Sequence, residues 1–181
     1  GVVARLEAVS ALGFYDLQDR LDALEAPPLL LLLDGVTDPR NLGACLRTAE
    51  AAGAHAVVVP RERRAPLNAA ARKTASGAAE RVPLVEVPNL ARAMQSLQER
   101  GIWLVGTSGG GVTPWDAVDA AIPLAWVLGA EGEGMRDLTA RRCDQLAVIP
   151  MAGKAESLNV SVATGVVLFE ALRQRRAAGL A

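Results

Sequence analysis

The sequence predicts one α/β domain with a mostly parallel sheet that is covered by helices on both faces. A length of 181 residues, 51% of them hydrophobic, supplies enough apolar side chains for a sizeable core. Short runs of Leu, Val and Ile, bounded by Gly, Pro or Asp, alternate along the chain with segments of helical spacing. The runs are apolar throughout, which is typical of strands whose two faces are both buried.

The expected strands are the apolar runs at residues 29–34, 56–60, 82–87, 102–106, 124–129 and 146–150. The first contains five consecutive leucines, far short of the ~20 apolar residues that span a bilayer, so it predicts a buried strand. The expected helices cover residues 15–25, 41–52, 66–75, 90–100, 135–142 and 157–176. The three glycines of TSGGGVTP, residues 107–114, disfavour helix and strand, so we expect a flexible segment there.

The charge balance excludes an overall attraction to nucleic acid or to an anionic membrane. Nineteen basic residues face twenty acidic ones, for a net charge of −1, so a polyanionic partner must be held by local patches. Aromatic residues make up 3% of the chain, which argues against a base-stacking platform. Several basic residues could either form a solvated surface or contact phosphates, and both interpretations remain open. These residues are Arg61, Arg63, Arg64, Arg72, Lys73, Arg136, Arg141, Arg142 and Lys154.

The cysteine and histidine content excludes a zinc site. Cys45 and Cys143 stand far apart in the sequence without a CxxC pattern, and His55 is the single histidine. No signal-peptide pattern occurs, and nothing around the cysteines predicts a disulfide. We therefore expect a cytoplasmic protein.

The first motif with chemical potential is LDGVTDPRNLGACLRTAEAAGA, residues 33–54. It predicts a strand, a turn through Asp38-Pro39 and a helix that begins near Asn41, which would cap it. Arg47, six residues later, would project from the first turns of this helix. A helix cap followed by a solvated arginine is the structural alternative.

The second motif is VLGAEGEGM, residues 127–135, directly after an expected strand. Its small residues let a backbone approach a ligand closely, and Glu131 and Glu133 place carboxylates beside that ligand. The pattern is neither the dinucleotide fingerprint nor the phosphate loop. Carboxylates suit a ligand with a cationic centre or hydroxyl groups, and a Gly-rich turn with solvated glutamates is the alternative.

The third motif is IPMAGKAESLNVSVATGVVLFEAL, residues 149–172, a strand, a loop and a helix. We expect Ser157 to cap this helix, with Asn159 and Ser161 in its first turn. No GxSxG surrounds Ser157, and the only histidine precedes a different strand, which argues against a hydrolase triad.

Together NLGACLR, GAEGEGM and IPMAGKAESLNVSVATG resemble the three motifs of the SpoU (TrmH-like) family of SPOUT RNA 2'-O-ribose methyltransferases. The order, spacing and flanks of the motifs match over about residues 29–176. Within the family, LDGVTDPRNLGACLR and SLNVSVATG most resemble the bacterial enzymes that methylate a guanosine of 23S rRNA. The resemblance implies a C-terminal deep trefoil knot, which periodicity alone cannot reveal because threaded chains are rare.

The resemblance also implies S-adenosylmethionine as methyl donor, with S-adenosylhomocysteine as product, no metal, and a homodimer with its sites near the interface. Carried over by motif, the catalytic set is Arg47, Asn41, Glu131, Ser157 and Asn159. The implied cofactor contacts are Thr107, Gly106, Gly129, Gly134, Ile149, Met151 and Leu158.

The implied reaction is an in-line methyl transfer to a ribose 2'-hydroxyl, which requires alignment and a more nucleophilic oxygen. Arginine is a poor general base because its pKa lies above ~12, so we favour Arg47 as a donor to the target phosphate or the developing alkoxide. A role as base stays open. We expect methylation of a guanosine 2'-hydroxyl in 23S rRNA or a precursor particle; the alternatives are a tRNA ribose methyltransferase and a catalytically idle RNA-binding or assembly module.

For the domain organisation, we expect residues 1–26 to be the end of a linker or an N-terminal extension with a short helix. Residues 27–181 would form the SPOUT catalytic domain. Relatives carry a small N-terminal RNA-binding domain, and GVVARLEAV at the start of this chain resembles its tail or the linker.

Overall fold

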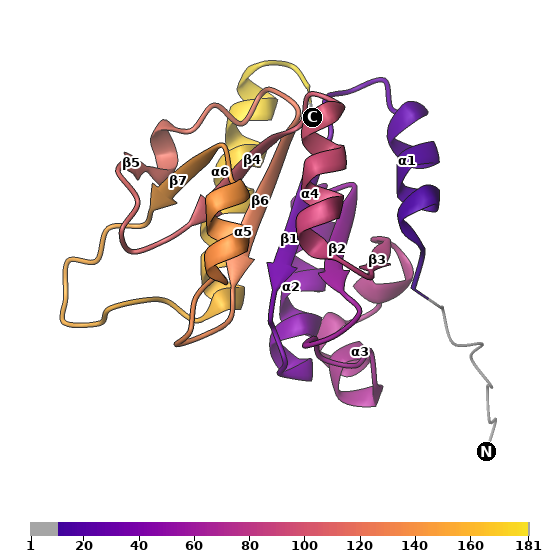
Figure 1. The fold of residues 1–181 in the computed structure, drawn as a ribbon, viewed down its shortest axis with the longest axis horizontal. Helices are drawn as coiled ribbons and strands as arrows, with labels where there is room; N and C mark the ends of the chain where they lie inside the picture. The colour runs from indigo at the N-terminus through magenta and orange to yellow at the C-terminus, as the bar shows by residue number, and fades with distance from the viewer. Residues whose placement is uncertain (1–10, 181) are drawn as a thin grey trace.

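A computed structural model describes residues 11–180, and its centre is a seven-stranded sheet in which all strand pairs are parallel. The strand order is β3-β2-β1-β6-β4-β7-β5 (Figure 1). The strands are β1 (Leu29–Asp34), β2 (Ala56–Pro60), β3 (Leu84–Val87), β4 (Trp103–Thr107), β5 (Thr113–Pro114), β6 (Leu124–Gly129) and β7 (Gln145–Val148). Three expected strands, β1, β2 and β6, have the predicted bounds.

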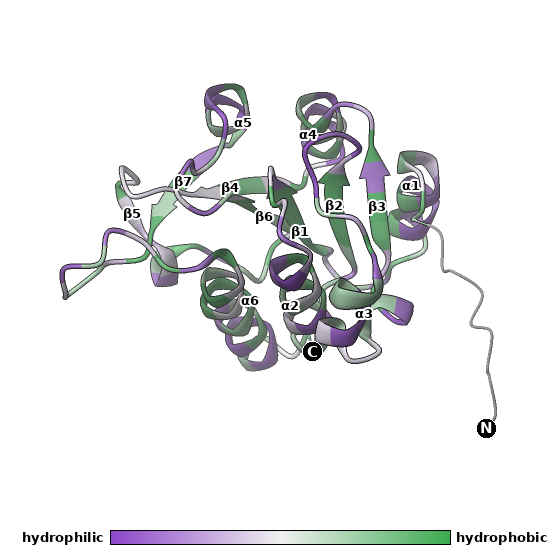
Figure 2. Cartoon of the chain, turned by 90° about the horizontal axis from the view of Figure 1, so that it is seen from below, coloured by the Kyte–Doolittle hydropathy of each residue, from purple (hydrophilic) through white to green (hydrophobic). Residues whose placement is uncertain are grey.

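Helices cover both faces of the sheet, as the sequence predicts. Figure 2 shows α2, α3 and α6 on one face, with α4 and α5 on the other; α1 packs beside α4. The helices are α1 (Phe14–Asp22), α2 (Pro39–Ala51), α3 (Ala69–Ala75), α4 (Leu90–Glu99), α5 (Asp137–Arg142) and α6 (Val160–Ala177), with 3-10 turns η1 (Ala78–Glu80) and η2 (Trp115–Ala117). None of the helices between residues 11 and 180 is long and apolar enough to cross a membrane.

The five leucines of β1 supply both halves of the core. Because side chains alternate along a strand, Leu29, Leu31 and Leu33 join the cluster beneath α2 and α6. Leu30 and Leu32 join the cluster beneath α1 and α4. Each of the five is at most 1% exposed, and burying such a side chain stabilises the fold by roughly 1.5–3 kcal/mol.

Two helices are capped by residues other than those predicted. Asp38, not Asn41, caps α2: its Oδ1 accepts a hydrogen bond from the Arg40 amide at 2.8 Å. Pro39 then occupies the first helical position, where its missing N–H costs nothing. Asn159, not Ser157, caps α6 by accepting from the Ser161 amide at 2.9 Å, so Ser157 lies in the preceding loop.

The expected N-terminal extension is packed onto the domain from residue 11 onward. Leu12 forms a parallel bridge with Val85 at the edge of β3, with backbone hydrogen bonds of 2.9 Å on both sides. Leu17 of α1 is 1% exposed within the core cluster beneath α4. The short helix of the expected extension, α1, therefore packs against the sheet and contributes to the core. The expected tail GVVARLEAV lies outside the described residues.

The glycine-rich segment 107–114 ends in a strand, contrary to the expectation of no regular structure. Thr107 of β4 and Thr113 of β5 both pair with Ala147, on opposite sides of β7. The chain between them passes directly over β7: a Cβ on Gly111 would lie 2.7 Å from the carbonyl carbon of Ala147. The glycine therefore permits a close crossing.

A buried arginine fastens the end of α6 to the amino edge of the sheet. Arg175, 4% exposed, donates to the carbonyl oxygens of Ala120 and Ile122 before β6, and to those of Pro27 and Pro28 before β1. Burial lowers the pKa of this guanidinium. Four carbonyl partners compensate in part for the lost hydration of the charge.

Burial of His55 should make folding stability depend on pH. The Leu29 amide donates to Nδ1 of His55 at 2.9 Å, which requires an unprotonated nitrogen, and burial lowers the pKa below 6.5. The unfolded chain therefore binds a proton at a higher pH than the folded one, so this contribution to stability is present above pH 6.5 and is lost as the pH falls towards the folded pKa.

We predict that His55→Asn, whose amide oxygen can accept from Leu29 without titrating, flattens the fall in melting temperature between pH 7 and pH 5. Thermal unfolding of both proteins across that range measures the difference. Parallel curves for the two proteins would contradict the assignment, because the remaining carboxylates titrate alike in both.

Candidate active site

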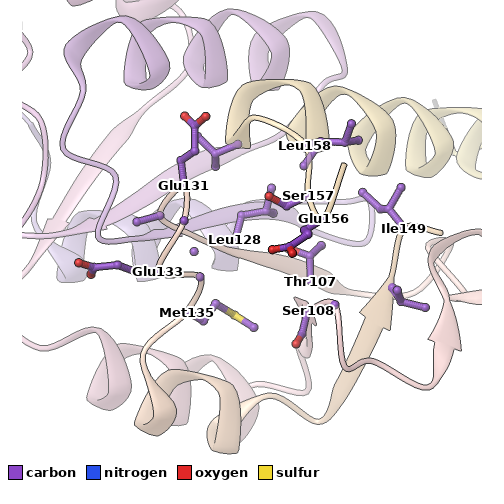
Figure 3. Close-up of a pocket in the computed structure, with 18 of the residues that line it drawn as sticks. Thr107, Ser108, Leu128, Glu131, Glu133, Met135, Ile149, Glu156, Ser157 and Leu158 are labelled. Atoms are coloured by element: carbon purple, nitrogen blue, oxygen red, sulfur yellow. The ribbon is translucent and has the colours of Figure 1, made fainter. Parts of the chain in front are cut away.

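The carboxyl ends of β4, β6 and β7 meet at one edge of the sheet and enclose a cavity of about 380 Å³ (Figure 3). Its walls come from three segments: the end of β4 and its loop, the loop after β6, and the long loop between β7 and α6. The strand-to-helix connections of the second and third motifs therefore meet in space. Such an edge is where open α/β sheets bind ligands.

The loop after β6 folds back on its own strand. Ala130 and Gly134 form an antiparallel bridge with hydrogen bonds of 3.1 and 2.9 Å. A Cβ on Gly129 would lie 2.0 Å from the carbonyl carbon of Gly134, so no other residue fits there without displacing the backbone. Gly132 and Gly134 have φ values of +82° and +70°, a region that favours glycine.

A buried carboxylate holds the far end of this loop. Asp34, the last residue of β1, has a fully buried side chain and pairs in register with Gly129. Its Oδ2 accepts from the Arg136 amide at 3.0 Å and its Oδ1 from Arg136 Nε at 2.7 Å. The Asp34–Arg136 pair therefore fixes the base of the loop that forms one cavity wall.

Three polar side chains from the three motifs meet beside the cavity. Nδ2 of Asn159 donates to Oδ1 of Asn41 at 3.1 Å and to Oε2 of Glu131 at 3.0 Å. Oδ1 of Asn159 accepts from the Ser161 amide and hydroxyl. Asn159 is thus oriented by the start of α6 and links α2 to the loop after β6.

The cavity wall combines carboxylates with apolar side chains. Its lining contains Glu131, Glu133 and Glu156 and no Lys, Arg or His. In Figure 3 the Glu156 carboxylate extends towards the loop after β6, while Glu131 and Glu133 project from that loop's outer side. Apolar side chains supply much of the rest: Leu128, Met135, Val148, Ile149, Met151, Leu158 and Val160. This chemistry suits a ligand with a cationic centre and an apolar or aromatic part, and it disfavours a phosphate.

Eight of the twelve residues named from the sequence line this cavity: Thr107, Gly129, Glu131, Gly134, Ile149, Met151, Ser157 and Leu158. Asn41 and Asn159 lie beside it through the hydrogen bonds to Glu131 and to each other. Gly106, an implied cofactor contact, is not among the lining residues. A Cβ there would lie within 2.9 Å of Met135, Cys143 and Leu146, so this glycine makes room for packing beneath the site.

Arg47 lies outside the cavity wall, on the exposed side of α2. Its side chain makes no hydrogen bond or ion pair with another residue in the range 11–180. Residues on the neighbouring stripe, such as Cys45 and Thr48, face α6 instead. Within one chain, the arginine is therefore free to meet a group that arrives from outside.

Sequence reasoning missed the Asp34–Arg136 pair. The signal was present in Asp34, an acidic residue that ends an otherwise apolar strand, since a carboxylate there needs a partner when buried. The identity of that partner, 102 positions away, could not be read from the sequence.

The two cysteines are free and poorly suited to nucleophilic chemistry. Burial raises the pKa of the Cys45 thiol to about 11 and that of the Cys143 thiol to about 12. Both therefore stay protonated near neutral pH. The described residues contain no group of three or more His, Cys, Asp or Glu that could hold a metal ion.

The fold and motifs match known RNA methyltransferases. The SpoU rRNA Methylase family model matches residues 28–169, so the chain belongs to that family. It is 58% identical, over 97% of its length and 70% of the relative's, to the 23S rRNA (guanosine-2'-O-)-methyltransferase RlmB of Ralstonia nicotianae.

Two solved structures carry the same architecture. The SpoU methyltransferase AviRb from Streptomyces viridochromogenes, in complex with the cofactor AdoMet, superposes with a TM-score of 0.80 at 32% identity, over 87% of this chain. This chain spans 61% of that structure. The A. aeolicus TrmH/SpoU tRNA modifying enzyme superposes with a TM-score of 0.79 at 30% identity, over 92% of this chain and 84% of that one.

We predict that Arg136→Ala weakens S-adenosylmethionine binding by about tenfold or more, because the loop after β6 loses its anchor. Breaking the pair should also destabilise the fold by about 1–3 kcal/mol, less than the 3–5 kcal/mol of fully buried pairs, since Arg136 is 46% exposed. Calorimetric titration and thermal unfolding measure the two effects.

Arg141→Ala on α5 is the matched control, because Arg141 is exposed, does not belong to the Asp34 pair, and carries the same charge as Arg136. Arg136→Lys keeps the charge but loses the two-pronged contact, and should fall between the wild type and Arg136→Ala. Equal cofactor affinity in Arg136→Ala and Arg141→Ala would refute the positioning role.

Proposed function

We propose that this chain transfers a methyl group from S-adenosylmethionine to the ribose 2'-hydroxyl of a guanosine in 23S rRNA. The observation that carries the proposal is the 58% identity to an RlmB enzyme over 97% of the chain. The cavity at the carboxyl edge of the sheet supports it independently, since its wall matches the chemistry of that cofactor.

The cavity residues fit S-adenosylmethionine. The cofactor has a positive sulfonium and an ammonium group, and the Glu156 carboxylate extends into a cavity whose lining contains no Lys, Arg or His. Its adenine suits the apolar wall at Ile149 and Leu158. When bound, the cofactor supplies an electrophilic methyl group; the protein's part is to hold donor and acceptor in line and to exclude water.

The proposed residue roles follow from position. Asn159, whose amide contacts Asn41, Glu131 and Ser161, would act as a positioning residue that holds Glu131 beside the cavity. Ser157, at the cavity wall, would contact the ribose. Arg47 would donate to the target phosphate or the developing alkoxide, because a guanidinium does not accept a proton near neutral pH.

We also propose a deep trefoil knot and a homodimer. The crossing of residues 108–112 over β7 at Gly111 is what a threaded chain requires. Val162 and Phe169 on α6 remain about half exposed, and they favour a second copy against α6 and α2. In such a dimer, Arg47 of one chain would serve the cavity of the other. Residues 27–181 would form the methyltransferase domain of a cytoplasmic protein.

The substrate is tested by tritium transfer from labelled S-adenosylmethionine. We predict incorporation into 23S rRNA from cells that lack the gene, at a guanosine ribose found by mass spectrometry, and none into 23S rRNA already methylated. Incorporation into tRNA instead would replace the proposed substrate, and no incorporation with cofactor binding intact would favour a catalytically idle module.

We predict that Arg47→Ala lowers the methyl-transfer rate by about 10²–10³-fold while cofactor affinity changes less than a few fold, because the residue lies outside the cavity wall. Single-turnover rates and calorimetry separate the two effects. Loss of cofactor binding with the fold intact would place Arg47 in the cofactor site.

Mixing Arg47→Ala with Asn159→Ala tests the shared site. If each cavity is completed by the partner's arginine, a heterodimer purified with two different tags contains one intact site and regains activity. Inactivity of that heterodimer would confine each site to a single chain.

A further inference from the structure

The near-neutral net charge of the chain conceals an asymmetry between the two faces of the sheet. The helices on the α2, α3 and α6 face carry seven basic and two acidic residues, whereas α1, α4 and α5 carry four basic and five acidic ones (Figure 2). On the first face both acidic residues are paired, Glu50 with Arg81 and Glu170 with Arg173. Of the basic residues on this face, Arg175 is buried, and Arg72 and Arg173 form ion pairs. The cations that remain exposed to a partner are Arg40, Arg47, Lys73 and Arg176.

The connection between β2 and α3 extends this charge to the edge that holds the cavity. Its backbone is fixed at two points. Arg64 forms an ion pair with Glu86 and donates to the Ala65 carbonyl oxygen at 2.9 Å. The Ala65 amide donates to the Val36 carbonyl oxygen at 2.7 Å, which ties the connection to the turn before α2.

The two other arginines of this connection are exposed. Arg61 and Arg63 make no hydrogen bond or ion pair with any residue that the structure describes through their side chains. Arg63 has a φ of 59°, a backbone conformation that residues other than glycine rarely adopt. A fixed loop that holds two guanidinium groups in solvent, one on an unfavourable backbone, is typical of a binding surface more than of a chance arrangement.

A third exposed arginine lies between this loop and the cavity. Arg40, at the start of α2, uses only its backbone amide, in the cap formed by Asp38. We call Arg40, Arg61 and Arg63 the basic rim. In the sheet, β2 lies two positions from β6, or roughly 10 Å at the usual strand spacing, so the rim and the cavity share one edge.

We propose that the basic rim binds backbone phosphates of the RNA strand that flanks the nucleotide in the cavity. The proposal rests on the proposed function and adds the path of the substrate over this domain. The cavity lining holds no basic side chain, so the phosphates of a bound RNA must be neutralised elsewhere. Guanidinium groups match phosphate oxygens in geometry and charge, and the rim presents them beside the site.

The test compares two double variants with the same change in charge. Arg61→Ala/Arg63→Ala removes two cations from the basic rim. Arg20→Ala/Arg92→Ala removes two exposed cations from α1 and α4, the helices on the opposite face of the sheet. Rates at varied RNA concentration and salt, calorimetry with S-adenosylmethionine and fluorescence anisotropy with an RNA oligonucleotide of the target loop are measured on both. Thermal unfolding confirms that both are folded.

We expect the rim variant to raise the KM for RNA about tenfold or more, with kcat at saturating RNA and cofactor affinity unchanged. The slope of log affinity against log salt should fall by about 2, one for each lost phosphate contact. Glu62→Gln, which removes the acidic neighbour of the two arginines, should shift RNA affinity the other way.

Equal KM values and salt slopes in the two double variants would overturn the proposal. If neither protein nor the wild type methylates rRNA, the proposed function fails; the anisotropy measurement then still decides whether the rim binds RNA. A loss of kcat with KM unchanged would also refute phosphate docking, because it would place the rim in the chemical step.

Discussion

The close approach of the chain to itself at Gly129 is the constraint on which the candidate site depends. The backbone of Gly134 and Met135 occupies the space that the Cβ of any other residue at position 129 would need. The loop after β6 can therefore fold back into the Ala130–Gly134 bridge and present its outer and inner sides to different partners. One side forms the cavity wall, and the other places Glu131 against Asn159.

The loop is held by side chains from elements that lie far apart in the sequence. Asp34 at the end of β1 accepts hydrogen bonds from Arg136, which follows the loop. Asn159 at the start of α6 contacts both Glu131 and Asn41. Each of these contacts joins two strand-to-helix connections, so the three motifs are held together at one edge of the sheet. The cavity is thus a property of the assembled edge and not of any single loop.

Acidic and basic residues are separated in space around the cavity, which the net charge of the chain does not show. Three glutamates and no basic residue belong to the cavity wall, where a cationic cofactor fits, while the exposed arginines of α2 and of the connection after β2 lie outside that wall. The arginines would attract a polyanionic substrate, and the carboxylates would attract the cationic methyl donor and repel the substrate's phosphates. The net charge of −1 is a sum over both regions, so it says little about RNA binding at either of them.

The sequence by itself determined six of the seven strands, the layers and the strand-to-helix connections that carry the motifs. A short continuous apolar run such as Leu29–Leu33, bounded by Pro and Asp, is typical of a strand buried on both faces. Glycines with carboxylates at strand ends mark where a ligand can approach. Only the tertiary structure decided that Asp38 and Asn159 cap their helices, that Gly106 serves packing, that Asp34 meets Arg136, and that Arg47 lies outside the wall of its own cavity. These outcomes depend on contacts between residues up to 118 positions apart and on which side of a helix meets a neighbour, and local patterns carry neither.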